Sequence, residues 1–228
     1  MNCFTDERRF QDDGPHIGMP RPKPRYGVDT VLYSADGDFN CSRCEYRFAH
    51  ETRCYMEQCP LYAELIRSGR VPYADALLRM ASGTGSKDFV NRVRYIIQDQ
   101  NKTEIIFCSP EHRNRFGGLR KNGVLYPGSP AAFTASLYLL TASCRLWNGI
   151  KPAVFAGEID FSSFGLGKLA YGGRHDYTLY KMAKEIYTGK AGIALSELCD
   201  RDIIGDKTFR LIVNALMIYR YGLNVVRF

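Results

Sequence analysis

Four cysteines in the first 60 residues of this 228-residue chain are spaced like the ligands of a metal ion. They follow the pattern C-x2-C-x9-C-x4-C and comprise Cys41, Cys44, Cys54 and Cys59. A C-x2-C pair places two thiolates on one tight turn, and a second pair brought back by a short connection completes the tetrahedron that Zn²⁺ accepts. Because nothing in the sequence points to an oxidising compartment, a metal is favoured over disulfides. The cluster predicts a zinc site, and four cysteine ligands predict a structural ion rather than a catalytic one.

An iron–sulfur cluster and a mixed ligand set are the alternatives to this zinc site. Cys59 is followed by Pro60, and a Cys-Pro step closes the ligand run of bacterial ferredoxins, although the nine-residue gap differs from theirs. His50 lies inside the loop and could replace one cysteine, but a solvated loop histidine is the favoured interpretation. Three isolated cysteines in apolar sequence are predicted to be buried free thiols: Cys108, Cys144 and Cys199.

Positive charge is concentrated in the C-terminal half of the chain. Residues 1–60 hold eight basic and ten acidic residues, residues 61–104 hold seven and five, and residues 105–228 hold sixteen and nine, within a net charge of +7. In the densest basic run, RNRFGGLRK, an aromatic residue and two glycines separate the cations. Such a run can contact a phosphate backbone, and a solvated helix end explains it equally well. The predicted phosphate-binding residues are Arg113, Arg115, Arg120 and Lys121.

The sequence holds no recognisable catalytic motif. A P-loop, a G-x-S-x-G elbow and an H-E-x-x-H zinc motif are all absent. Glu158 and Asp160 lie two residues apart, which on a strand places both carboxylates on one face. Together with His175 they are the alternative of an enzyme acting on nucleotides or nucleic acid. We therefore expect a binding protein rather than an enzyme, with no assigned catalytic residue.

Composition shifts divide the chain into four predicted parts. Residues 1–30 form a proline-rich extended arm, because each proline removes a donor and disfavours helix at the residue before it. Residues 31–60 form the cysteine module, residues 61–104 form connecting helices, and residues 105–228 form a basic helical domain. The predicted fold is therefore mainly α, a bundle-like helical domain with a small metal-stapled module near the N-terminus.

Helix ends are predicted from caps, prolines and glycines. A single long apolar helix is predicted from Pro130 to Trp147, and the glycine-rich stretch over residues 152–173 is ambiguous. Predicted N-terminal signals are Pro72, Ser86, Ser109-Pro110, Ser129-Pro130, Asp176 and Asp206, and predicted C-terminal signals are Gly69, Gly83, Asn148-Gly149, Gly189 and Gly222.

Four phrases in the C-terminal half carry a family resemblance: IIFCSPEHRNRF, SPAAFTASLYLLTASCRLW, YTLYKMAKEIYTG and DKTFRLIVNALMIYRYG. Through them residues 105–228 resemble an uncharacterised helical domain family of Gram-positive bacteria and their phages. The segment CSRCEYRFAHETRCYMEQCPLY, residues 41–62, resembles short four-cysteine modules of phage-borne proteins. That family has no assigned activity, so the resemblance implies no catalytic residue. The two resemblances imply a phage or mobile-element protein, with inhibition of host defence as an expected role.

Composition excludes several classes of protein. No apolar stretch of about 18 residues exists to span a membrane, and the polar, acidic start MNCFTDERRFQDDG has no apolar secretory region. We expect a cytoplasmic, zinc-containing protein without membrane association. The predicted partner is nucleic acid or a nucleoprotein complex, and a protein–protein adaptor is the alternative. The basic balance argues against inhibition by DNA mimicry, which needs an acidic surface.

Overall fold

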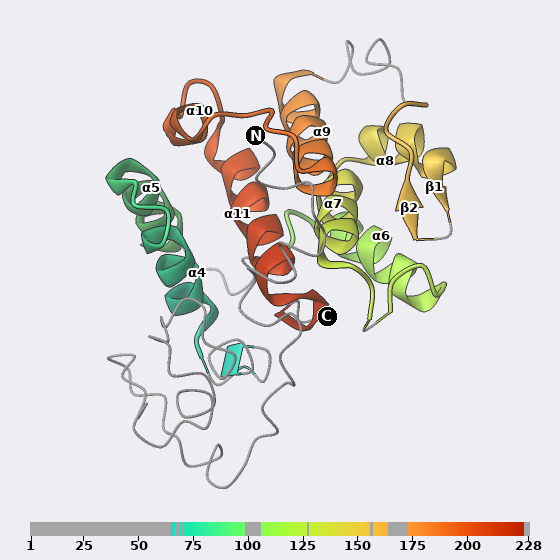
Figure 1. Cartoon of the computed structure of the whole chain (residues 1–228), viewed down its shortest axis with the longest axis horizontal. Coiled ribbons are helices and arrows are strands. Elements are labelled where there is room, and N and C mark those ends of the chain that lie inside the picture. Colours follow the sequence, from blue (N-terminus) through green and yellow to red (C-terminus); the bar gives the residue numbers. More distant parts are fainter. Residues whose placement is uncertain are drawn as a thin grey trace, which may run out of the picture.

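The computed structural model describes residues 65–66, 69, 71–98, 106–126, 128–155, 157–163 and 173–225. Within these residues the protein is mainly helical, with one pair of two-residue strands, as the predicted fold class requires (Figure 1). The predicted proline-rich arm and the cysteine module, residues 1–30 and 31–60, lie outside the described residues. The elements in chain order are α4 (Tyr73–Ser82), α5 (Lys87–Gln98), α6 (Pro110–Lys121), α7 (Ala131–Ala142), α8 (Cys144–Ile150), the 3-10 helix η3 (Lys151–Ala153), β1 (Val154–Phe155), β2 (Glu158–Ile159), α9 (Gly173–Thr188), α10 (Leu195–Cys199), α11 (Asp206–Tyr221) and the 3-10 helix η5 (Leu223–Val225).

The first two helices in this order begin and end close to their predicted signals. Gly83 follows α4 as its C-cap, and the Oγ of Ser86 accepts a hydrogen bond from the backbone N–H of Phe89 at 3.2 Å to cap α5. Pro72 is the N-cap of α4 rather than a first-turn residue. The sequence also predicts an apolar stripe on α5 at helical spacing, formed by Phe89, Val90, Val93, Ile96 and Ile97. Phe89, Val93 and Ile96 are buried, and Val90 and Ile97 are half-buried, so the stripe is the inner face of the helix.

The long apolar helix predicted from Pro130 to Trp147 is wrong, because two helices occupy this stretch. Ser143 between α7 and α8 has φ −107° and ψ 130°, which breaks the helix. Its Oγ accepts a hydrogen bond from the N–H of Leu146 at 3.3 Å, so the serine caps α8. Ser129 does not cap α7, since its Oγ accepts from the N–H of Tyr126 at 2.9 Å.

Part of the ambiguous glycine-rich stretch folds as a short hairpin. Strands β1 and β2 pair antiparallel, with Val154 opposite Ile159 and Phe155 opposite Glu158. Gly157 has a φ of 83°, a conformation that a side chain disfavours, and so permits the tight connection.

The two long C-terminal helices end where the sequence predicts and begin earlier than it predicts. Gly189 follows α9 with a φ of 68°, and Gly222 follows α11 with a φ of 83°. Asp176 and Asp206 were the predicted caps, yet both lie in the first turn of their helices. There the two carboxylates still meet the positive end of the helix dipole.

The most buried helix, α7, lies at the centre of the molecule and packs against α6, α8, α9 and α11 (Figure 1). Every residue from Phe133 to Ala142 is buried, which explains why this helix is apolar on all sides. The helices α4 and α5 pack on α11 and join the same hydrophobic core. A buried polar chain crosses this core: the Tyr73 hydroxyl donates to Asn214 at 2.9 Å, and the Asn214 amide donates to the Tyr138 hydroxyl at 3.3 Å.

Candidate nucleic-acid interface

The helix α6 carries the predicted phosphate-binding residues and is fixed at its N-terminus as the sequence predicts. The Oγ of Ser109 accepts a hydrogen bond from the N–H of His112 at 3.2 Å, and Pro110 occupies the first helical position, which needs no N–H. Buried His112, Phe116 and Leu119 form its inner face. The remaining positions of α6 are therefore available to face solvent.

The four predicted residues do not share one environment. Arg120 and Lys121 are exposed in the last turn of α6, where cations also oppose the negative end of the helix dipole. Arg113 is half-buried, and its guanidinium lies 5.8 Å from the ring centroid of Phe107. At 100° per residue Arg113 and Arg120, seven residues apart, lie on the same side of the helix. These two arginines and Lys121 form the outer cationic face of α6.

Arg115 points away from that outer cationic face. Its Nε donates to the carbonyl oxygen of Thr141 at 2.7 Å, and its Nη2 donates to that of Ala142 at 3.1 Å. These are the last carbonyls of α7, which have no partner within the helix. The guanidinium thus closes the C-terminus of α7, and we leave Arg115 out of the candidate interface.

Positive charge is segregated along the described helices. Residues 106–155, from just before α6 to β1, hold six basic residues against one acidic residue, Glu111, and residues 157–163 hold two acidic residues and no basic one. Residues 71–98 hold four against two, and residues 173–225 hold eight against six. Four of the six basic residues in the stretch 106–155 lie on α6, one lies on α8 and one lies in η3, whereas α7 has no charged residue. These six basic residues are Arg113, Arg115, Arg120, Lys121, Arg145 and Lys151.

A tyrosine that the sequence did not single out, Tyr126, follows the cationic end of α6 after a turn. Tyr126 is 54% exposed, the largest fraction among the exposed large hydrophobic residues of the described ranges. Leu125, directly before it, is buried at 1% exposure and fixes the chain. In the sequence, Leu125 and Tyr126 lie between Gly123 and Gly128, which predicts a turn. The sequence does not show which of these two side chains is buried and which is exposed.

Cys108 and His112 form the one thiol–imidazole pair seen in the described part of the chain. The Sγ lies 3.5 Å from His112 Nδ1, and the imidazole Nε2 donates to the backbone carbonyl oxygen of Tyr138 at 2.9 Å. Burial raises the pKa of the Cys108 thiol and lowers the pKa of fully buried His112 to about 4. Both groups are therefore neutral at pH 7, which is the opposite of an activated thiolate–imidazolium pair. The pair is a buried polar contact of the core.

The prediction that three isolated cysteines are buried is wrong, because none of them is fully buried. Cys144 is exposed, since the break at Ser143 turns the start of α8 outward. Cys108 and Cys199 are half-buried. The residues predicted to hold a metal, Cys41, Cys44, Cys54 and Cys59 with His50 as a possible replacement, lie outside the described residues. Among the residues that the structure does describe, no group of three or more histidine, cysteine or acidic side chains could hold a metal ion.

The three residues of the enzymatic alternative have separate local roles. The Asp160 carboxylate accepts hydrogen bonds from the N–H of Ser162 at 2.8 Å and from its hydroxyl at 2.5 Å, as in a turn cap, which lowers the pKa of Asp160. Glu158 is exposed on β2, and this strand ends before Asp160. His175 Nδ1 lies 2.6 Å from the Thr208 hydroxyl. No hydrogen bond or ion pair joins these three groups in the described ranges.

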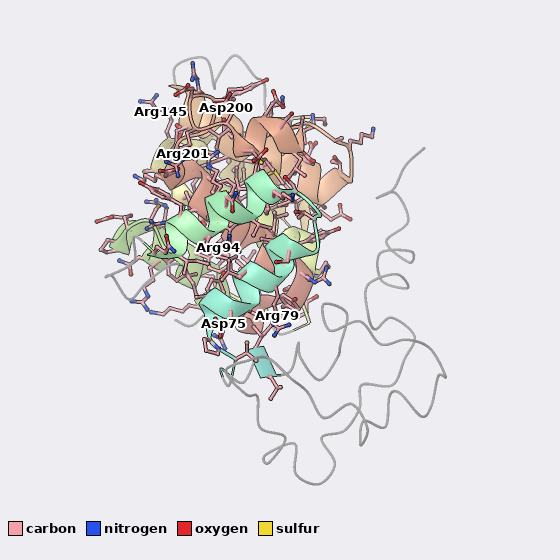
Figure 2. The ribbon with its side chains drawn as sticks, turned by 90° about the vertical axis from the view of Figure 1, so that its left-hand side faces the viewer. Asp75, Arg79, Arg94, Arg145, Asp200 and Arg201 are labelled. Atoms are coloured by element: carbon pink, nitrogen blue, oxygen red, sulfur yellow. The ribbon has the colours of Figure 1, made fainter. Side chains whose placement is uncertain are left out.

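A cleft of about 450 Å³ lies on the side of α5 away from α4. Figure 2 faces these two helices and shows Asp200 and Arg201 beyond α5. The Arg201 guanidinium lies 3.8 Å from the ring centroid of Tyr95, and buried Arg92 donates to backbone carbonyls, so both cations already have partners. The cleft is electrostatically balanced, with two carboxylates and two guanidinium groups among its lining residues: Asp88, Asn91, Arg92, Ser196, Cys199, Asp200 and Arg201.

Comparison of the chain with protein-family models, with curated proteins and with solved structures finds no match. The resemblance of residues 105–228 to an uncharacterised helical family stays a prediction. Among the described helices, none is long and apolar enough to cross a membrane.

Proposed function

We propose that this protein binds nucleic acid, alone or within a nucleoprotein complex, through the outer cationic face of α6. The observation that carries the proposal is the charge segregation over residues 106–155, with six basic residues against one acidic residue. A cationic helix face attracts an array of phosphates, because each neutralised phosphate releases a counterion. Arg113, Arg120 and Lys121 are the residues placed to make those contacts.

Charge reversal tests this assignment. The double variant Arg120→Glu with Lys121→Glu is expected to weaken binding to oligonucleotides at low salt. Losing two phosphate contacts lowers the slope of log K against log salt by about 1.4 to 1.8, since each contact contributes about 0.7 on single strands and 0.9 on duplex. Fluorescence anisotropy of a labelled oligonucleotide over a salt series measures both quantities.

Two control variants separate the site from net charge and from stability. Lys87→Glu with Arg94→Glu changes the net charge equally on α5, which lies across α7 and α11 from α6 (Figure 1). Arg115→Gln removes a helix-closing cation and is expected to lower stability without changing the salt slope. If the α5 double variant weakens binding as much as the α6 double variant, or if neither does at any salt concentration, the α6 assignment is refuted.

We also propose that Cys41, Cys44, Cys54 and Cys59 hold one structural zinc ion, on the strength of their spacing. Protein purified without a chelator is expected to contain about one zinc per chain and to show no visible absorption band. Cys54→Ser is expected to lose the metal, whereas the matched variant of an exposed isolated cysteine, Cys144→Ser, keeps it. Elemental analysis and an ultraviolet–visible spectrum decide the matter. A brown protein that contains iron would show that the four cysteines hold an iron–sulfur cluster instead of zinc.

A role against host defence follows from the family resemblance of the sequence and belongs to the same proposal. A nucleic-acid-binding protein of a mobile element would meet a defence complex at the nucleic acid that both recognise. In the described residues, Asp160 and His175 make separate local contacts and Glu158 is exposed, so no observation there supports the enzymatic alternative.

A further inference from the structure

The turn after α6 holds Tyr126 in a fixed position. Gly123 has a φ of 72°, and this conformation lets the N–H of Val124 donate to the carbonyl of Leu119 at 2.9 Å. The N–H of Gly123 donates to the carbonyl of Arg120 at 3.2 Å, which completes a Schellman motif. The cationic end of α6 and the chain that leads to Tyr126 are thus one hydrogen-bonded unit.

A second pair of hydrogen bonds fixes the tyrosine itself. The N–H of Tyr126 donates to the Ser129 hydroxyl at 2.9 Å, and the N–H of Ser129 donates to the Tyr126 carbonyl at 2.9 Å. The ring lies against Gly128, where an added Cβ would come within 3.3 Å of the ring atom Cε2. A glycine at this position therefore lets the ring rest on the turn.

Tyr126 presents an exposed aromatic ring on a turn that is held by hydrogen bonds of its backbone and of Ser129. The buried side chain of this turn is Leu125, at 1% exposure, so the fold does not need Tyr126 for packing. The ring stands five residues beyond Lys121, at the end of the helix that carries the outer cationic face. A flat ring beside cations is the combination with which proteins hold single strands, since bases stack on the ring while cations contact the phosphates.

We infer that this site takes single-stranded nucleic acid, with a base stacked on Tyr126 and the flanking phosphates on Arg120 and Lys121. A base in a duplex has both of its faces covered by neighbouring bases and cannot stack on the tyrosine without being unstacked. The inference rests on the proposed function and narrows its ligand class. Stacking uses the face that every base has, and so DNA and RNA single strands are both ligands.

Anisotropy titrations with labelled oligothymidine, oligouridine and a DNA duplex of matched length test this inference. The full chain is expected to prefer both single strands to the duplex. Tyr126→Ala is expected to weaken single-strand binding by about five- to 150-fold, which is the usual effect of removing one stacking ring. Tyr126→Phe keeps the ring and is expected to bind like the unchanged protein. Tyr126 is exposed, so both variants should unfold at the temperature of the unchanged protein.

The possible results distinguish a failure of the stacking site from a failure of nucleic-acid binding as a whole. Equal affinity for single strands in Tyr126→Ala and in the unchanged protein overturns the stacking site. If Arg120→Glu with Lys121→Glu still lowers affinity in that case, nucleic-acid binding stands without the stacking site. Absence of salt-dependent binding to all three oligonucleotides overturns both. Preference for the duplex also overturns the inference, and a preference for oligouridine over oligothymidine adds a 2′-hydroxyl contact to stacking.

Discussion

Replacing Arg92 with methionine is expected to lower the free energy of unfolding by about 2–5 kcal/mol, because buried backbone carbonyls lose their hydrogen-bond donor at about 1–3 kcal/mol each. Arg92 is 3% exposed, and its guanidinium links α5 to the segment between α10 and α11. Nη1 donates to the carbonyls of Leu198 and, at 3.1 Å, of Asp200. Nη2 donates to the carbonyl of Ile204 and to the Asp206 carboxylate at 3.3 Å.

The size of the expected loss follows from what the substitution leaves behind. The carbonyls of Leu198 and Ile204 would lose this donor, whereas that of Asp200 still accepts from the N–H of Ile204 at 2.9 Å. Buried unsatisfied groups destabilise by about 1–3 kcal/mol each. The guanidinium also lies 4.2 Å from the ring centroid of Phe209, a cation–π contact that methionine cannot replace. Methionine fills much of the same space. The loss of unfolding free energy is therefore due to the lost hydrogen bonds and charge and not to a cavity.

Two variants make this prediction specific. Arg92→Lys keeps the charge but not the planar fork that reaches several carbonyls at once, and it is expected to destabilise nearly as much as methionine. Arg94→Ala removes an exposed arginine two residues along α5, whose guanidinium contacts Asn91, and it is expected to change stability by about 0.5 kcal/mol or less. Urea unfolding followed by circular dichroism measures all three. If Arg92→Met and Arg94→Ala were equally stable, the hydrogen bonds of Arg92 would not contribute to stability as proposed.

Arg92 also shows what the sequence can reveal and what it cannot. The sequence predicts the inner stripe of α5, and Arg92 follows Phe89 by three residues and precedes Ile96 by four, so it lies on that stripe. A charged residue on an apolar face signals a buried ionic contact. Its partners, however, lie more than one hundred residues later in the chain. Helical periodicity cannot show which distant carbonyls a buried cation meets.

Local signals predicted helix ends well because caps are short-range contacts. Ser86 and Ser109 cap their helices, and Gly189 and Gly222 end theirs. The break at Ser143 escaped prediction because the apolar pattern runs on through α7 and α8, while the choice between a continuous helix and a new cap depends on tertiary packing.

The candidate interface was only partly predictable, because it also depends on tertiary packing. The run RNRFGGLRK indicates a cationic helix, but the direction of each side chain depends on where the neighbouring helices lie. Arg115 faces the C-terminus of α7, and Lys121 faces solvent. The exposed ring of Tyr126 depends on the burial of its neighbour Leu125, which is a property of the assembled core.

Lowering the pH is expected to lower the free energy of unfolding, because His112 must take up a proton in the unfolded chain but stays neutral in the folded one. Its imidazole is fully buried against the rings of Phe107 and Tyr138, with Cys108 as the one titratable side chain in hydrogen-bonding contact. Burial lowers the pKa of His112 to about 4 from an ordinary value of 6.5, and the charge of nearby Arg115 acts in the same direction.

The sign of the effect follows from proton binding. Between pH 6.5 and pH 4 the unfolded chain carries a protonated His112 while the folded chain carries a neutral one, so the unfolded state binds more protons. Stability contributed by neutral His112 is complete above pH 6.5 and is lost as the pH falls towards 4. The gap between the two pKa values corresponds to about 3 kcal/mol. Burial also lowers the pKa of His175, which adds to the same trend.

His112→Gln isolates this contribution from that of His175 and from the carboxylates. Glutamine has no titrating group, and its amide can still donate to the Tyr138 carbonyl, which the imidazole reaches at 2.9 Å. The variant is expected to be less stable than the unchanged protein at pH 7, because the ring contacts with Phe107 and Tyr138 are lost. Its stability is expected to fall less on acidification, so that the difference between the two proteins shrinks by about 3 kcal/mol from pH 7 to pH 4. Urea unfolding at a series of pH values measures that difference, and a difference that stays constant over this range would show that His112 keeps its ordinary pKa in the folded protein.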